Sequence, residues 1–77
     1  MKELLEYLAR GLVDEPDQVR VVEVQEDGAT VLELSVADDD YGNVIGRGGR
    51  TASALRTIIK SGGAKQGERV FLDIVDG

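Results

Sequence analysis

The chain has 77 residues, 42% of them hydrophobic, a formal net charge of −6 and neither cysteine nor histidine. This length allows a single domain over residues 1–77, and the missing side chains exclude disulfides, thiolate zinc sites and the usual nucleophile–base pairs, so we expect no metal, no cofactor and no catalysis. Because the N-terminus lacks a signal-peptide pattern and no apolar run approaches the roughly 20 residues of a membrane span, we expect a cytoplasmic protein without a membrane partner.

The first predicted element is an amphipathic helix over residues 2–12. Its apolar side chains recur three and four residues apart, with Lys and Glu between them. We expect Tyr7 to pack within this helix. Residues 14–17, which contain the only proline of the chain, predict a turn after it.

A β-hairpin follows the turn. Residues 19–25 are rich in β-branched side chains, and residues 30–36 alternate between apolar and polar ones. Asp27 and Gly28 lie between the two segments and are typical of a tight turn whose central residues need positive φ. The pattern predicts two antiparallel strands.

The second half contains two more helices and a last strand. Asp38, Asp39 and Asp40 predict a capped, solvated start of a short helix that ends near Ile45. The next helix begins at about Gly49, and residues 61–63 (Ser-Gly-Gly) predict its glycine-capped end. Residues 70–75 alternate again and predict a third strand. The order αββααβ indicates an α+β fold: a three-stranded mixed sheet, its third strand parallel to the second, with the helices packed on one face.

The charges are unevenly distributed along the chain. Residues 1–40 hold three basic and twelve acidic side chains, whereas residues 41–67 hold five basic side chains and no acid. Local potential, more than the total charge, steers an anionic partner. The acid-free segment is therefore the candidate binding region.

A glycine-rich loop lies inside this basic segment, at Gly46, Arg47, Gly48 and Gly49. Glycines let the backbone turn sharply and let another chain approach closely. The following helix opens with Arg50 and Thr51 in place of acids, so the positive end of its dipole favours an external anion such as phosphate. The loop predicts a phosphate-binding site.

Other glycine motifs fit this loop less well. A Walker loop needs a glycine at position 44, which is valine, and a dinucleotide-binding GxGxxG needs a third glycine at position 51, which is threonine. A plain turn between two helices remains the alternative.

Residues 44–49, Val-Ile-Gly-Arg-Gly-Gly, resemble the VIGxxG signature of KH domains, and the element order resembles the type II subclass. Over its full length the chain resembles the KhpA family of small stand-alone bacterial KH proteins, including Met-Lys-Glu-Leu at its start and Asp-Ile-Val-Asp near its end. The resemblance implies a type II KH domain that binds single-stranded RNA, with the GxxG loop clamping the backbone of about four nucleotides.

The resemblance also implies a set of binding residues within and beside the loop. The predicted RNA-binding residues are Val44, Ile45, Gly46, Arg47, Gly48, Gly49, Arg50, Thr51, Arg56 and Lys60. Leu34 and Ala52 are expected to contribute to the wall of the groove. Because Ala52 replaces the isoleucine of the extended family pattern and Gly48 carries no side chain, we expect the protein to grip RNA backbone more than to distinguish bases.

The implied role is that of an RNA chaperone or post-transcriptional regulator of low sequence specificity. Such proteins often work with a larger KH-containing partner of the Jag/KhpB type, as a heterodimer, and a homodimer is also possible. The alternative is a protein-interaction module whose KH surface mainly mediates homo- or heterodimerisation, for which the uncovered sheet face offers a surface. A small anion-binding enzyme subunit is the weakest interpretation.

Overall fold

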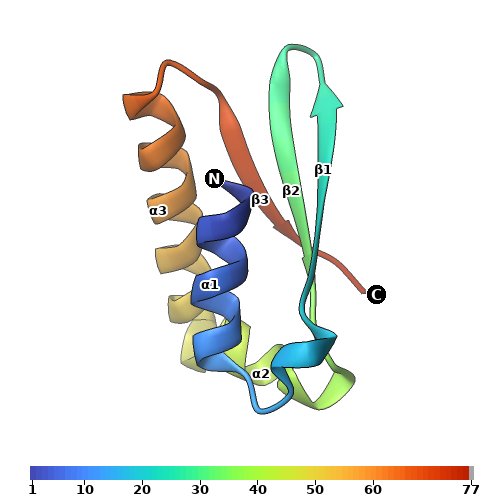
Figure 1. The fold of residues 1–77 in the computed structure, drawn as a ribbon. Coiled ribbons are helices and arrows are strands. Elements are labelled where there is room, and N and C mark those ends of the chain that lie inside the picture. The colour runs from blue at the N-terminus through green and yellow to red at the C-terminus, as the bar shows by residue number, and fades with distance from the viewer. Residues whose placement is uncertain (77) are drawn as a thin grey trace.

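The computed structural model describes residues 1–76 and contains the predicted order of helices and strands (Figure 1). The elements are α1 (Lys2–Leu12), β1 (Arg20–Glu26), β2 (Ala29–Ser35), α2 (Tyr41–Ile45), α3 (Arg50–Lys65) and β3 (Val70–Ile74). Three single-turn 3-10 helices lie in the connections: η1 (Pro16–Gln18), η2 (Asp38–Asp40) and η3 (Arg47–Gly49). The predicted α+β class and the αββααβ order are confirmed.

The β1–β2 hairpin turns at Asp27 and Gly28, as predicted. Both residues have positive φ, 49° and 79°, which the central positions of a tight primed turn require. The resulting register pairs Val21 with Leu34. Since paired residues share a face of the sheet, this register directs both side chains into the core.

Strand β3 pairs with β2 in parallel, with Thr30 opposite Val70 and Leu34 opposite Ile74. The strand order is β1-β2-β3. A parallel neighbour requires a crossover connection, and here α2 and α3 provide it. The joint between these two helices therefore lies beyond the end of β2, on one end of the molecule (Figure 1).

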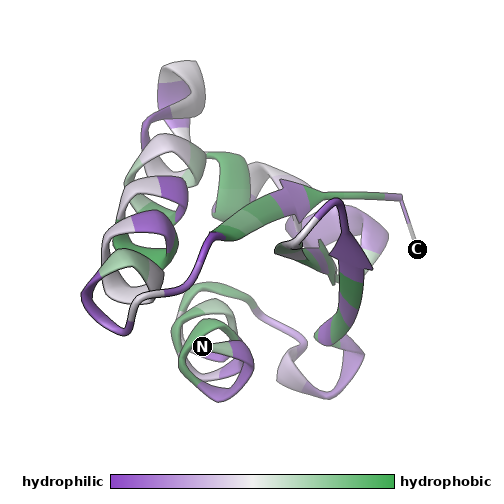
Figure 2. Ribbon diagram, turned by 90° about the horizontal axis from the view of Figure 1, so that it is seen from above, coloured by the Kyte–Doolittle hydropathy of each residue, from purple (hydrophilic) through white to green (hydrophobic). Residues whose placement is uncertain are grey.

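The core lies between the helices and one face of the sheet, and the apolar segments of α1, α3 and the strands face one another there (Figure 2). Its fully buried large side chains are Leu5, Leu32, Leu34, Val44, Ile59 and Val70. Phe71 is on the face that no described helix covers, with the Arg69 guanidinium carbon 5.9 Å from its ring centroid. Within residues 1–76, no helix is long and apolar enough to cross a membrane.

Helix α1 is amphipathic as predicted, with Leu5 and Ala9 buried. The prediction that Tyr7 packs within it was wrong, because Tyr7 is 76% exposed. Each residue turns an α-helix by about 100°. Tyr7 is two residues from Leu5 and two from Ala9, so its ring points away from the core that these residues face.

The predicted end of α3 at residues 61–63 was also wrong, because the helix continues to Lys65. Its glycine cap is Gly67, at φ 75°. The Gly67 N–H donates to the Ala64 carbonyl at 3.0 Å and the Glu68 N–H to the Gly63 carbonyl at 2.9 Å, the paired bonds of a Schellman motif. Gly63 serves packing: a Cβ there would lie 2.7 Å from Val70 Cγ2 and 2.9 Å from Val70 Cβ.

Two glycine-to-alanine changes test this assignment. Alanine normally stabilises a helix interior relative to glycine by about 0.5–1 kcal/mol. We expect that gain for Gly11→Ala, where a Cβ has nothing within 4 Å. We expect Gly63→Ala to destabilise by about 1 kcal/mol or more, because it overpacks the helix against buried Val70. Urea unfolding measures both, and a stabilised Gly63→Ala protein would contradict the packing role.

Candidate nucleic-acid interface

The loop of residues 46–49 has a backbone that mostly glycine can adopt. Gly46 has φ 76° and ψ 170°, a combination that is essentially restricted to glycine. Gly48 (φ 65°, ψ 17°) and Gly49 (φ 78°, ψ 12°) are left-handed. The Gly49 N–H donates to the Gly46 carbonyl at 3.1 Å and closes the loop. All three glycines are therefore explained by conformation.

The space available for a side chain differs among the three glycines. A Cβ on Gly46 would overlap the Thr51 hydroxyl and lie 2.8 Å from Thr51 Cβ and 2.9 Å from its backbone nitrogen. A Cβ on Gly48 or Gly49 would have nothing within 4 Å. Gly46 thus permits a close contact inside the protein, whereas Gly48 and Gly49 leave bare backbone on the outer surface of the loop.

Helix α3 begins directly after this bare backbone. Its first residue is Arg50, its N-cap is Gly49, no side chain caps it, and its first turn contains no acid. The N-terminus of a helix carries the positive end of the helix dipole. Here the Arg50 N–H already donates to the Arg47 carbonyl, so the dipole and the arginines are what favour an anion. The loop and the helix terminus together form a surface suited to an anion.

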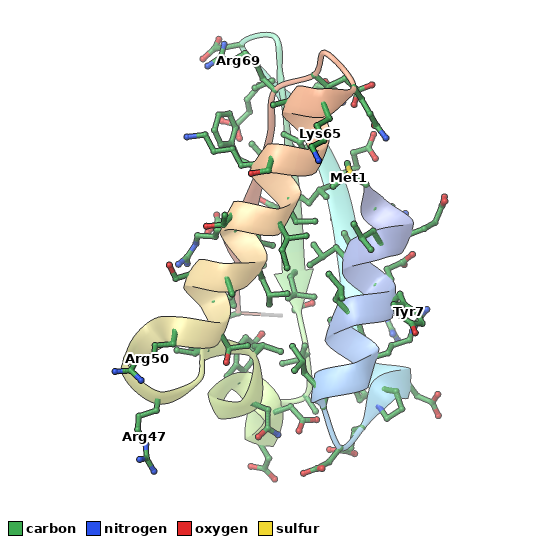
Figure 3. All side chains as sticks on the ribbon, turned by 90° about the vertical axis from the view of Figure 1, so that its left-hand side faces the viewer. Met1, Tyr7, Arg47, Arg50, Lys65 and Arg69 are labelled. Atoms are coloured by element: carbon green, nitrogen blue, oxygen red, sulfur yellow. The ribbon has the colours of Figure 1, made fainter. Side chains whose placement is uncertain are left out.

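Basic side chains surround this surface. Arg47 and Arg50 are exposed and extend from the same corner of the molecule (Figure 3). Arg56 and Lys60 are exposed on α3 and lie four residues apart, so they share a side of that helix. The predicted cationic residues therefore lie at the loop and farther along α3.

The apolar residues predicted beside the loop differ in their burial. Ile45 is 40% exposed, and Thr51 is half-buried. Val44 and Leu34 are completely buried, and Ala52 is 3% exposed. The side chains of these three residues are buried in the protein, so Ile45 and Thr51 are the members of this group that offer surface to a ligand.

Tyr41, next to the loop in sequence, has a structural contact. Its hydroxyl donates a hydrogen bond of 2.6 Å to the Val75 carbonyl. This bond joins the start of α2 to the segment after β3. Tyr41 therefore has a structural role in this part of the fold.

Asp40 is a supporting residue that sequence reasoning missed. It was expected to cap and to face solvent, but it is 1% exposed and its side chain makes no cap bond. Its carboxylate accepts the backbone N–H groups of Asp14 at 3.0 Å and Glu15 at 3.1 Å, and the Asn43 amide at 2.8 Å. These partners tie the segment after α1 to α2, which leads into the loop.

The hydrogen bond from Asp14 lowers the pKa of Asp40 below its ordinary value of 3.8; burial opposes this, and the bonds from Glu15 and Asn43 reinforce it. A lowered folded-state pKa means that the unfolded chain binds more protons, so this stabilisation is present above pH 3.8 and is lost as pH falls through the folded value. We expect Asp40→Asn to lower the thermal midpoint at neutral pH, because its NH2 group would replace one of the two oxygens that accept backbone N–H groups. We also expect the thermal midpoint of this variant to depend less on acid pH.

The control is Asp39→Asn, since Asp39 is exposed in the same 3-10 helix. Calorimetry between pH 2.5 and 7, a range chosen to span the ordinary carboxyl pKa, should show almost no change for this control. Equal effects of the two variants would contradict the role of Asp40.

Among residues 1–76, no group of His, Cys, Asp or Glu side chains is arranged to hold a metal ion.

Comparison with known proteins gives one family. Residues 2–74 match the family model described as "KhpA/KhpB, KH domain". The RNA-binding protein KhpA of Clostridium acetobutylicum is 49% identical over 75 residues, covering 97% of this chain and 100% of that protein. The proteins of the same name from Halalkalibacterium halodurans (51%; 99% and 100% covered) and Aquifex aeolicus (45%; 99% and 96% covered) are similar at comparable length.

Proposed function

The chain belongs to the KhpA/KhpB KH-domain family, and from that membership we propose that it binds single-stranded RNA through the loop of residues 46–49. One observation carries the assignment to the loop: bare glycine backbone leads into an uncapped, acid-free helix terminus between Arg47 and Arg50. Phosphates of an RNA strand meet the positive end of the helix dipole and two guanidinium groups at this point. The relatives named RNA-binding protein KhpA support the ligand class.

The loop favours recognition of backbone over bases. Base readout needs side chains that stack on bases or hydrogen-bond their edges. Gly48 and Gly49 supply none, and the apolar surface beside them is mainly Ile45, since Ala52 and Val44 are buried. The protein therefore acts on many RNAs in the cytoplasm, as a chaperone or post-transcriptional regulator, and no catalysis is part of this role.

A second KH surface would complete the function. One short loop contacts few phosphates, so its affinity alone is modest, and a linked second surface raises the overall affinity through effective concentration. The matching family model groups KhpA with KhpB. A larger KH-containing protein of the Jag/KhpB type is the partner that this grouping supports.

The salt dependence of binding tests the backbone grip. Each phosphate neutralised on a single strand contributes a slope of about −0.7 to log K against log[salt]. With two or three phosphates held by the loop, the slope should be about −1.4 to −2.1 and nearly equal for RNAs of different base composition. Fluorescence anisotropy with labelled octamers measures it, with duplex RNA as the weaker-binding control. An RNA affinity that does not change with salt concentration, or that is high for one RNA sequence only, would contradict the proposal.

A further inference from the structure

The face of the sheet that no described helix covers has no role in the function proposed above. Successive side chains of a strand point to opposite faces. Because Leu32 and Leu72 are buried toward the helices, the residues next to them in each strand point to the uncovered face. Four apolar and two acidic side chains lie together on this uncovered face: Val22, Val24, Val31, Glu33, Phe71 and Asp73. Exposed apolar side chains that adjoin one another mark an interaction surface.

The strand register places three of the apolar side chains in one row. Val24 pairs with Val31 across β1 and β2, and Val31 pairs with Phe71 across β2 and β3. Neighbouring strands lie about 4.8 Å apart, so the row extends about 10 Å across the sheet. Val24 and Val31 are half-buried, whereas Phe71 is 36% exposed. Val22, which is 54% exposed, continues the apolar surface along β1.

Two carboxylates adjoin this apolar row on the side away from the hairpin turn. Glu33 and Asp73 pair across β2 and β3, each two residues along its strand from the row. Like charges directly opposite each other on neighbouring strands are destabilising. No cation among residues 1–76 forms an ion pair with either carboxylate. The folded protein therefore keeps a repulsion that its own side chains do not relieve.

The cations nearest in the fold are engaged elsewhere. Arg20 is on the uncovered face, but its guanidinium donates to two backbone carbonyls at 2.8 and 3.1 Å. Arg69 stacks over the Phe71 ring from the side of the hairpin turn, with its guanidinium carbon 5.9 Å from the ring centroid. Glu26, the remaining acid on this face, also lies at the turn. The side away from the turn is therefore the one that attracts an external cation.

We propose that the uncovered face of the sheet binds a segment of another protein that carries apolar side chains and a lysine or arginine. The apolar side chains pack on Val24, Val31 and Phe71, and the cation lies between Glu33 and Asp73. A cation at this point is attracted by both carboxylates and offsets their mutual repulsion. A local arrangement that lowers the stability of the free protein is typical of a functional site.

Charge selects this occupant over RNA and over a second copy of the chain. The phosphates of an RNA would approach two carboxylates, which repel them. A second copy also carries a net charge of −6, and its docking on this face would desolvate the acid pairs of both copies. No residue of the loop at 46–49 lies on the uncovered face, so the contact proposed here and RNA binding by the loop are tested separately.

The stability of the free protein tests the repulsion. Glu33→Lys places a cation opposite Asp73, so we expect it to raise the urea and thermal midpoints. The control is Glu23→Lys, the same exchange on β1, where the paired residue is Leu32. Both variants change the net charge equally, so only the local pairing differs. A Glu33→Lys protein no more stable than the Glu23→Lys protein would overturn the proposal.

A phage-displayed library of random peptides tests the chemistry of the partner. The library is first depleted on Phe71→Thr protein, because threonine keeps the strand propensity but removes the ring, and is then selected on the wild type. We expect the surviving peptides to combine apolar residues with lysine or arginine. Their dissociation constants should rise roughly tenfold or more with Glu33→Lys and about twofold at most with Glu23→Lys.

The same variants distinguish the other occupants. Phe71→Thr should leave the affinity for RNA octamers and the sedimentation of the protein unchanged. A loss of RNA affinity would assign the uncovered face to RNA, and a change of oligomeric state would assign it to a second copy; either result refutes the proposal. It also fails if no peptide survives the depletion, if the survivors lack basic residues, or if they bind the Glu33→Lys protein as tightly as the wild type.

Discussion

Replacing Arg47 and Gly48 together with aspartate should lower the affinity for single-stranded RNA by roughly 100-fold or more at low salt. The two substitutions remove one cation and add two anions at the proposed phosphate site. Like charges that meet at such a contact cost several kcal/mol of binding free energy. The fold should remain, because Arg47 is exposed and a Cβ at Gly48 meets nothing within 4 Å. Aspartate also tolerates the left-handed conformation of Gly48 better than most residues do.

The chain contains a matched control for this double variant. Gly67 is also left-handed, at φ 75°, with open space around its Cβ position. Arg69 is exposed nearby, at the opposite end of α3 from Arg47 (Figure 3). Gly67→Asp with Arg69→Asp changes the same residue types and the same total charge. If this control lowers RNA affinity as much as the loop variant does, general charge explains binding and the loop does not.

Gly46→Ala should destabilise the protein by about 3 kcal/mol and abolish RNA binding. Two causes act together. Alanine does not adopt φ 76° with ψ 170° without strain, and its Cβ would overlap Thr51, whose backbone nitrogen belongs to the first turn of α3. The loop must open, and the N–H groups that it aligns with the helix terminus are displaced. Urea unfolding and RNA titration measure the two effects.

Gly48→Ala is the comparison for Gly46→Ala. It occupies the left-handed region without any steric contact, so we expect it to destabilise by about 1 kcal/mol and to retain most RNA affinity. Equal destabilisation by the two variants would contradict the special role of Gly46, both in its backbone conformation and in its contact with Thr51.

The sequence predicted the elements whose signals are local. β-branched residues and the alternation of apolar residues predicted the strands, and Asp27 with Gly28 predicted the hairpin turn. The signals of Gly62 and Gly63 were ambiguous, because glycine follows helix ends and also permits close packing. Only the position of Val70, on a strand that follows the helix, distinguishes the two cases for Gly63.

The lack of a local signal also explains why the predictions for Asp40 and Tyr7 were wrong. Asp38, Asp39 and Asp40 are identical in type, and nothing local shows that only Asp40 meets N–H groups 25 and 26 residues earlier in the chain. Tyr7 lies on an amphipathic helix whose outer face no described element covers. Contacts between distant segments decide both cases, so periodicity could not reveal them.

The loop itself was predictable because it is contiguous. Its glycines, its arginines and the acid-free start of the next helix lie within a few consecutive residues. The hollow between α1 and α3 is lined by residues that lie far apart in the sequence, such as Tyr7 and Ala54, and no sequence pattern connects them. The structure therefore adds mainly what the fold brings together.

Amide chemical shifts test the central claim most directly. In a 15N-labelled protein titrated with two RNA octamers of different sequence, we predict the largest shifts at Gly46, Gly48, Gly49 and Arg50. Both RNAs should give the same pattern, because the proposed contacts of this loop and helix terminus are with phosphates, which every sequence shares. Shifts that avoid these residues and concentrate on α1 or on the uncovered face of the sheet would contradict the account.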